Sequence, residues 1–190
     1  MIEFIEQEHI YLKDGIILPS VSEILHFIFP DKYKNVDKEI LNKKAEYGST
    51  IHKAIECIEN NEELPQLNFI QEESIKQYLK LKKKYNIEVL NQEQMVSYEY
   101  DYCGRFDMIA NISDNYSLAD IKTTTELDKE YLSWQLSFYE LASGKTFDKF
   151  YVIWLPKKEL GQLVEIERKS KKELLNKLEE FLKIKEEIWK

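Results

Sequence analysis

The sequence has few cysteines, no long apolar run and a deficit of positive charge. Only Cys57 and Cys103 occur in 190 residues, and neither belongs to a C-x-x-C pair. This argues against a structural zinc site and excludes a four-cysteine iron–sulfur cluster. No apolar run approaches the roughly 20 residues that span a bilayer, and the charge-rich N-terminus does not resemble a signal peptide. We therefore expect a soluble, cytoplasmic protein without a membrane segment.

The net charge is −8 at neutral pH. This counts against a protein that coats nucleic acid, because affinity for DNA depends largely on neutralising phosphates. It leaves room for a metal-dependent site, which is itself acidic and in which bound cations supply positive potential. Any non-specific DNA contact must then be local. The lysine-rich segment 80–84 and the pair Lys32 and Lys34 are candidates, although a solvated helix face explains the segment slightly better.

The composition favours one compact α/β domain over residues 1–190. A chain of this length with 43% hydrophobic residues can bury one core, and it contains no internal repeat, low-complexity tract or flexible linker. We expect a short hairpin and a helix over residues 1–30, a core over 37–167 and a C-terminal helix over 171–189.

Periodicity and capping signals predict the individual elements. Ser20 and Glu23 have the spacing of a capping box, and their helix should end before Pro30. Further helices are expected over Asp37–Asn60, Phe69–Tyr85 and Asp128–Ser143. Strands are expected over Glu88–Tyr98, Tyr98–Ile112, Ser117–Thr125, Phe150–Leu155 and Gly161–Glu167.

Two of these strands form a predicted hairpin that carries charged residues. Residues 113–115 have turn chemistry, and a loop at 114–115 places Asp107 directly opposite Lys122. Because successive side chains alternate faces, Asp120 shares the face of Lys122. Two carboxylates and an ammonium then meet on one patch. A register shift of one residue would move Asp107 to the other face.

Paired carboxylates are the ligands with which proteins usually hold Mg²⁺ beside a phosphate-containing substrate. Such an ion polarises a phosphodiester and lowers the pKa of an attacking water. A neighbouring lysine can orient or deprotonate that water, or offset the negative charge of the transition state. A surface Asp–Lys pair is the alternative, and it is the commoner arrangement when such a trio is considered alone.

Several segments carry a family resemblance. GRFD (Gly104 to Asp107), ADIKTT (Ala119 to Thr124) and QLSFY (Gln135 to Tyr139) resemble the G-x-x-D, D/E-x-K and Q-x-x-x-Y motifs of the PD-(D/E)XK nuclease superfamily. The match is closest to the RecB-like exonuclease branch common in phages. LPSVSEIL (Leu18 to Leu25) and YGSTIHKAIE (Tyr47 to Glu56) resemble the same branch, which has a G-x-x-x-H motif, here Gly48 to His52. A D-x-K motif occurs by chance in many proteins, but four motifs in order across residues 18–155 are a specific signal.

The resemblance implies a restriction-endonuclease-like core, with a central mixed β-sheet flanked by helices. It also implies a DNA hydrolase with one or two Mg²⁺ or Mn²⁺ ions and no iron–sulfur cluster. The implied ligands are His52, Asp107, Asp120 and the main-chain carbonyl of Ile121. The implied catalytic group is Lys122, which would act on the attacking water with the support of Gln135 and Tyr139.

Some residues keep two interpretations. By itself, a histidine beside an apolar stripe is more often a core residue, and only the resemblance makes His52 a ligand. Glu56, one helical turn further, either touches a second cation or is a surface carboxylate. Arg105 either contacts phosphate or forms an internal salt bridge. Gly48, within a helix, should have a reason such as the close approach of another backbone.

The favoured function is a DNA exonuclease that processes ends in phage-type recombination or repair. The alternatives are an endonuclease of the same superfamily and a non-catalytic module that binds DNA or a protein partner. DNA is the expected partner, and a recombination protein is a second candidate. The polarity of degradation, the strand preference and the oligomeric state are left open by the sequence.

Overall fold

The computed structural model describes residues 1–5, 10–32, 34 and 36–188. Its helices are α1 (Val21–Ile28), α2 (Lys38–Asn60), α3 (Phe69–Lys84), α4 (Lys129–Ser143) and α5 (Lys171–Ile188). Its strands are β1 (Ile2–Ile5), β2 (Ile10–Lys13), β3 (Ile16–Leu18), β4 (Glu88–Tyr98), β5 (Tyr102–Ile112), β6 (Asn115–Lys122), β7 (Lys149–Trp154) and β8 (Gln162–Ile166). None of the described helices has the length and apolar character that a membrane crossing requires.

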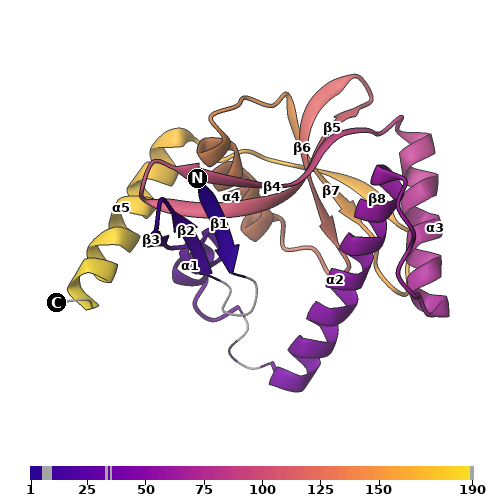
Figure 1. Ribbon diagram of the computed structural model, residues 1–190, viewed down its shortest axis with the longest axis horizontal. Coiled ribbons are helices and arrows are strands. Elements are labelled where there is room, and N and C mark those ends of the chain that lie inside the picture. The colour runs from indigo at the N-terminus through magenta and orange to yellow at the C-terminus, as the bar shows by residue number, and fades with distance from the viewer. Residues whose placement is uncertain (6–9, 33, 35, 189–190) are drawn as a thin grey trace.

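A mixed five-stranded sheet in the order β4-β5-β6-β7-β8 forms the centre of the molecule (Figure 1). Neighbouring strands are antiparallel except β6 and β7, which are parallel. One buried cluster joins a face of the sheet to α1, α4 and α5, and a second joins the opposite face to α2 and α3. Helices therefore cover both faces, which confirms the predicted α/β class with a mixed central sheet.

The helix ends lie where the capping residues predict them. Ser20 forms a complete capping box with Glu23, and the side chain of Asp37 accepts hydrogen bonds from the first turn of α2. Asp128 caps α4 in the same way, and Gly144 ends that helix in the left-handed conformation. The predicted end of the last helix, at residue 189, lies outside the described residues.

The N-terminal segment forms a small sheet of its own. The sequence predicts a hairpin there, and the described residues add a third strand, so that β1, β2 and β3 pair in order. Asp14 and Gly15 make the turn between β2 and β3 with φ angles of 52° and 81°. Residues 6–9, which belong to the predicted hairpin, are not described.

The hairpin of β5 and β6 has a different register from the predicted one. Its two loop residues are Ser113 and Asp114, with φ angles of 48° and 65°, and not residues 114–115. Both the backbone N–H and the hydroxyl of Ser113 donate to the carbonyl oxygen of Tyr85, which stabilises this turn. The ladder is therefore shifted by two residues, and Asp107 falls in line with Asp120 instead of Lys122.

Gly104 and Gly48 provide a pair of stability tests. A Cβ at Gly104 would lie 2.7 Å from Tyr139 Cε1 and 2.9 Å from Val21 Cγ2, whereas one at Gly48 would meet only Thr123 Oγ1 at 3.5 Å. We expect Gly104→Ala to lower the free energy of unfolding by about 1–3 kcal/mol through overpacking. Gly48→Ala should raise it by about 0.5–1 kcal/mol, because alanine favours the helix. Urea unfolding of both variants checks the opposite signs, and equal signs would contradict this packing.

Candidate active site

The strands β5 and β6 separate at the candidate site. Their ladder ends at the pair Met108 and Ala119, so Asp107 and Asp120 are the next residues beyond it. Instead of a strand carbonyl, the Oδ2 atom of Asp107 accepts a hydrogen bond from the backbone N–H of Ile121 at 2.6 Å. The side chain of Asp107 is thereby fixed at the point where the two strands part, and its Oδ1 atom is turned toward α2.

The strands β5 and β4 both deviate from regular geometry next to the site. Phe106 packs in the cluster of α1, α4 and α5, while Met108 packs in the cluster of α2 and α3. Residues two positions apart normally share a face, so the side-chain alternation of β5 is interrupted at Asp107. On the neighbouring strand β4, Glu93 lies between the residues that pair with Met108 and Phe106, level with Asp107, and has a left-handed φ of 48°. Such a conformation costs a non-glycine residue about 1–2 kcal/mol, and here it directs a carboxylate toward the site.

Helix α2 contributes an imidazole to the same place. The Nε2–H of His52 donates to the main-chain carbonyl oxygen of Ile121 at 3.0 Å. The Nδ1 atom of His52 lies 3.6 Å from Asp107 Oδ1 and 3.9 Å from Glu93 Oε1. The other ring nitrogen is thus aimed between two carboxylates that come from two different strands.

These three residues fit a divalent cation. One ligand atom each from His52, Glu93 and Asp107 lies within 4.8 Å of the others, in the part of the chain that the structure describes. Adjacent ligands of a six-coordinate Mg²⁺ are about 3 Å apart, so only small side-chain movements are needed. Burial lowers the pKa of His52, but Asp107 and Glu93 outweigh it and raise the pKa to about 9. The two carboxylates therefore attract positive charge strongly, as a cation site must.

Asp120 and Lys122 form an ion pair beside this cluster, in which Asp120 is buried and Lys122 is half-buried. Asp120 Oδ2 lies 2.6 Å from Lys122 Nζ, although no described donor is directed at Oδ2 with hydrogen-bond geometry. Burial raises the pKa of Asp120 to about 6 against the opposing effect of Lys122. Burial lowers the pKa of Lys122, but Asp120 and Asp107 outweigh it, so the pKa is raised and the side chain is an ammonium.

Helix α4 contributes Gln135 and Tyr139, one turn apart. The ring of Tyr139 packs against Gly104, and its hydroxyl is hydrogen-bonded by the side chain of Gln135. Burial and the charges of Asp107 and Asp120 raise the pKa of Tyr139 well above its usual value. Gln135 Oε1 is buried and has no hydrogen-bond partner among the residues described. It is therefore an unsatisfied acceptor beside Tyr139.

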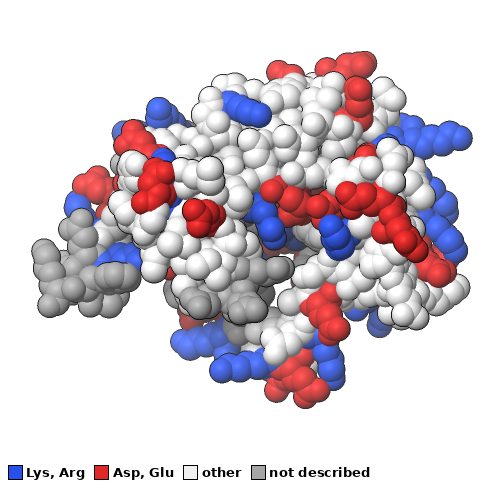
Figure 2. Space-filling view, viewed as in Figure 1, with Lys and Arg blue, Asp and Glu red and all other residues white. Residues whose placement is uncertain are grey.

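The cluster opens into a hollow of about 760 Å³, whose lining includes His52, Glu93, Asp107, Tyr139, Arg105 and Glu56. Figure 2 shows acidic side chains in a band across the middle of the visible face, over β4 and the upper part of α2. Lys122 lines a neighbouring hollow of about 590 Å³, together with Lys32, Thr124 and Tyr131. Lys122 is therefore not part of the lining of the larger hollow, and its ammonium is connected to the candidate site through its pair with Asp120.

The structure shows the contacts of the three residues for which the sequence left the role open, Arg105, Glu56 and Gly48. Arg105 Nε lies 3.0 Å from Glu93 Oε2, which is the internal salt bridge. Glu56 lines the hollow and pairs with Lys53 at 2.9 Å. Gly48 meets only the side chain of Thr123 at ordinary van der Waals distance, so the expected close approach of a backbone is wrong.

The structure also shows the partners of two lysines that were candidates for contacting DNA. Lys32 is paired with Asp128 and lies over the ring of Tyr131. Within the lysine-rich segment 80–84, Lys82 pairs with Glu59 and so links α3 to α2. Lys32 and Lys82 therefore have structural partners within the protein.

Glu93 was not predicted as a site residue. Its place level with Asp107 depends on the register of β4 against β5 and on the irregularity between Val89 and Asn91. The predicted strand over Glu88–Tyr98 includes Glu93, but no signal in the sequence marks this irregularity.

No protein-family model and no curated protein sequence matches the chain. Among solved structures, the crystal structure of SSO0001 matches with a TM-score of 0.55 and 15% identity, covering 94% of this chain and 80% of that chain. An alkaline exonuclease from Laribacter hongkongensis, LHK-Exo, matches with a TM-score of 0.46 and 13% identity, covering 87% and 86%. LHK-Exo in complex with dAMP gives a TM-score of 0.44. At these identities the similarity to SSO0001 shows a shared fold alone, and the two lower TM-scores carry no argument about function.

The three-residue cluster predicts a specific effect on metal affinity. We expect Glu93→Gln to weaken Mn²⁺ binding by at least about tenfold, because it removes one of two carboxylate charges. Glu88→Gln in the same strand is the matched control, since Glu88 is exposed and hydrogen-bonds Asn111 at 3.3 Å. Isothermal titration calorimetry measures both affinities, and equal Mn²⁺ affinities in the two variants would remove Glu93 from the site.

Proposed function

We propose that the chain is a metal-dependent deoxyribonuclease of the PD-(D/E)XK type, which hydrolyses phosphodiester bonds in DNA. One observation carries this proposal. The ligand atoms of His52, Glu93 and Asp107 cluster beside the Asp120–Lys122 pair, at the point where β5 and β6 separate. A cation site next to a half-buried ammonium is suited to a phosphate group, whose oxygens can face both.

In this proposal the cation would be held by His52, Glu93 and Asp107, with Asp120 as a further ligand. The main-chain carbonyl of Ile121, which was expected as a ligand, instead accepts the Nε2–H of His52 on the side of the ring away from Nδ1. A bound Mg²⁺ or Mn²⁺ supplies positive charge to the phosphate and lowers the pKa of a coordinated water. The donor set of carboxylates and one imidazole suits these ions, and the imidazole makes Mn²⁺ somewhat more favourable.

Lys122 is proposed to act on the attacking water and on the developing negative charge. Its ammonium lies 2.6 Å from Asp120 Oδ2 and its side chain is a quarter exposed, so it can donate a hydrogen bond into the neighbouring hollow that it lines. Gln135 and Tyr139 support this arrangement from α4 through their mutual hydrogen bond. The reaction is an in-line displacement in which positioning and charge stabilisation supply most of the rate.

The finer function we propose is an exonuclease acting at DNA ends in phage-type recombination or repair. The order and spacing of the motifs support the RecB-like branch. The non-catalytic alternative is disfavoured because every motif residue is present and the charged members of the set interact with one another.

The mechanism predicts a large loss of activity without Lys122. We expect Lys122→Gln to lower kcat for degradation of end-labelled DNA in Mn²⁺ by about 10²–10³-fold, because it removes the positive donor beside the phosphate. Lys149→Gln on the neighbouring strand β7 is the control. Lys149 lies away from the site, and its Nζ atom is 2.5 Å from Glu165 Oε1. Unchanged degradation by Lys122→Gln would eliminate this mechanism, provided that both variants keep the wild-type circular dichroism spectrum.

The exonuclease assignment predicts a dependence on DNA ends. Wild type in Mn²⁺ should degrade linear DNA and leave closed circular DNA intact, because hydrolysis must begin at an end. Gel analysis of both substrates over the same time course provides the measurement. Cleavage of the circle at a similar rate would favour the endonuclease and refute the exonuclease.

A further inference from the structure

A separate hollow lies beside the candidate site, at the edge of the sheet where β6 and β7 end. These two strands are parallel and pair up to Lys122 and Trp154, so the segments that follow them leave the sheet together. Ligands in α/β folds commonly bind outside the carboxyl ends of such strands. The hollow, called here the lysine–threonine pocket, has a volume of about 200 Å³ and is formed mainly by Lys44, Tyr47, residues 123–125, Lys157 and Lys158.

The pocket is positively charged, although the chain as a whole carries −8. Lys44, Lys157 and Lys158 line it against the single acidic residue Glu159. Within the described part of the chain, none of these lysines lies within ion-pair distance of a carboxylate. On the same helix as Lys44, by contrast, Lys43 pairs with Glu39 and Lys53 pairs with Glu56. The pocket therefore collects positive charge that the protein itself does not neutralise.

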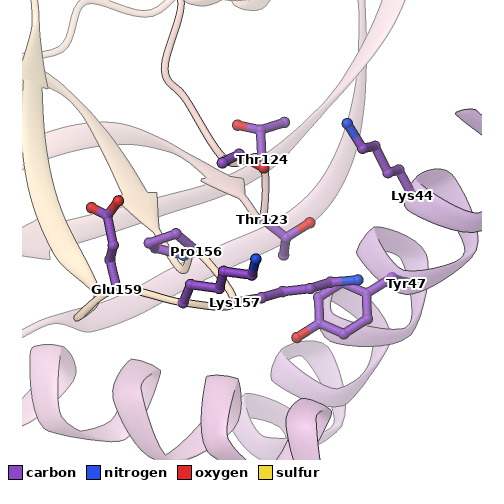
Figure 3. A pocket seen from close by; sticks show the side chains of 9 residues that line it. Lys44, Tyr47, Thr123, Thr124, Pro156, Lys157 and Glu159 are labelled. Atoms are coloured by element: carbon purple, nitrogen blue, oxygen red, sulfur yellow. The ribbon is translucent and has the colours of Figure 1, made fainter. Parts of the chain in front are cut away.

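The floor of the pocket is rigid. Lys157 Nζ lies 3.6 Å from the centre of the Tyr47 ring, and the Tyr47 hydroxyl is 2.8 Å from Ser74 Oγ. Trp154 Nε1 donates to the carbonyl oxygen of Thr124 at 2.7 Å, which fixes the threonine segment. Figure 3 shows Lys44 of α2, Lys157 of the segment after β7, and Thr123 and Thr124 arranged around one space.

Donors for an anion are available in this rigid frame. The hydroxyl of Thr124 is already used, since it donates to the carbonyl oxygen of Glu126 at 2.8 Å. The hydroxyls of Thr123 and Thr125 make no hydrogen bond to any other described residue. Two hydroxyl groups and the lysine ammonium groups thus surround the space. Protein contacts to nucleic-acid phosphates commonly use these donor types.

We propose that the lysine–threonine pocket binds a backbone phosphate of the DNA strand, near the phosphate that is hydrolysed. The identity of the strand rests on the proposed function. Thr123 directly follows Lys122, and two residues of extended chain span about 7 Å. The pocket is therefore close enough to Lys122 to bind a nearby phosphate of the DNA strand whose phosphodiester is hydrolysed. Its role is to hold the strand in register for the site without taking part in the chemistry.

The test uses the variant Lys44→Gln/Lys157→Gln and a fluorescently labelled single strand of roughly 12 nucleotides, a typical site size. Fluorescence anisotropy in EDTA measures binding without cleavage. We expect the Kd to rise about tenfold and the slope of log K against log salt to become shallower by about 0.7 for each lost phosphate contact. In Mn²⁺, kcat/KM of this variant should fall because KM rises.

The matched control is Lys171→Gln/Lys172→Gln, which removes the same charge at the start of α5. Its Kd should stay within about twofold of wild type, because a distant exposed charge is largely screened. A Lys44→Gln/Lys157→Gln variant with the Kd and salt slope of this control would overturn the proposal. So would inorganic phosphate that binds the wild-type pocket as tightly as the strand does.

The pocket and the nuclease function can fail separately. Wild type that binds the strand through Lys44 and Lys157 but does not cleave it in Mn²⁺ would support the pocket and contradict the nuclease. Cleavage that proceeds with an unchanged KM in the Lys44→Gln/Lys157→Gln variant would support the nuclease and contradict the pocket.

Discussion

The hydrogen bond from the backbone N–H of Ile121 to Asp107 Oδ2 is the interaction on which the candidate site depends. It occupies the place where a β5 carbonyl would continue the ladder, so the two strands can separate without leaving this donor unpaired. The separation leaves the carbonyl oxygen of Ile121 for His52 and exposes Asp107 Oδ1 to the imidazole. A single carboxylate therefore both ends the ladder and begins the metal cluster.

Charge balance explains how so many ionisable groups are held together in the candidate site. Three carboxylates each lie beside a cationic group, in the pairs Glu93 with Arg105, Asp107 with His52, and Asp120 with Lys122. Unpaired, buried carboxylates would cost several kcal/mol each. The left-handed backbone at Glu93 is a further cost in this region. Such costs are typical of functional sites, where the surrounding structure maintains a local arrangement that is unfavourable by itself.

Local chemistry explains which parts of the structure could be predicted from the sequence. Helix ends depend on residues within one turn, so the caps at Ser20, Asp37 and Asp128 locate them directly. The contribution of His52 was predicted through a motif, because periodicity alone cannot distinguish a ligand from a core histidine. The placement of Gln135 beside Tyr139 follows from helical spacing and is found in the structure.

The missed features depend on contacts between distant parts of the chain. Asp and Asn adopt positive φ most readily, which favoured a loop at residues 114–115. The loop instead includes Ser113, which is held by the carbonyl oxygen of Tyr85, 28 residues earlier. The error in register was two residues, which leaves alternation unchanged, so Asp107 and Asp120 still meet. Glu93 was missed because its partner in β5 is set by a strand irregularity that the sequence does not indicate.

The most direct test of the central claim is the anomalous diffraction of crystals grown with Mn²⁺. The account predicts an anomalous peak at coordination distance, about 2.0–2.4 Å, from both His52 Nδ1 and Asp107 Oδ1. Glu93 or Asp120 should complete the protein ligands. Manganese bound elsewhere, with no peak between His52 and Asp107, would contradict the account.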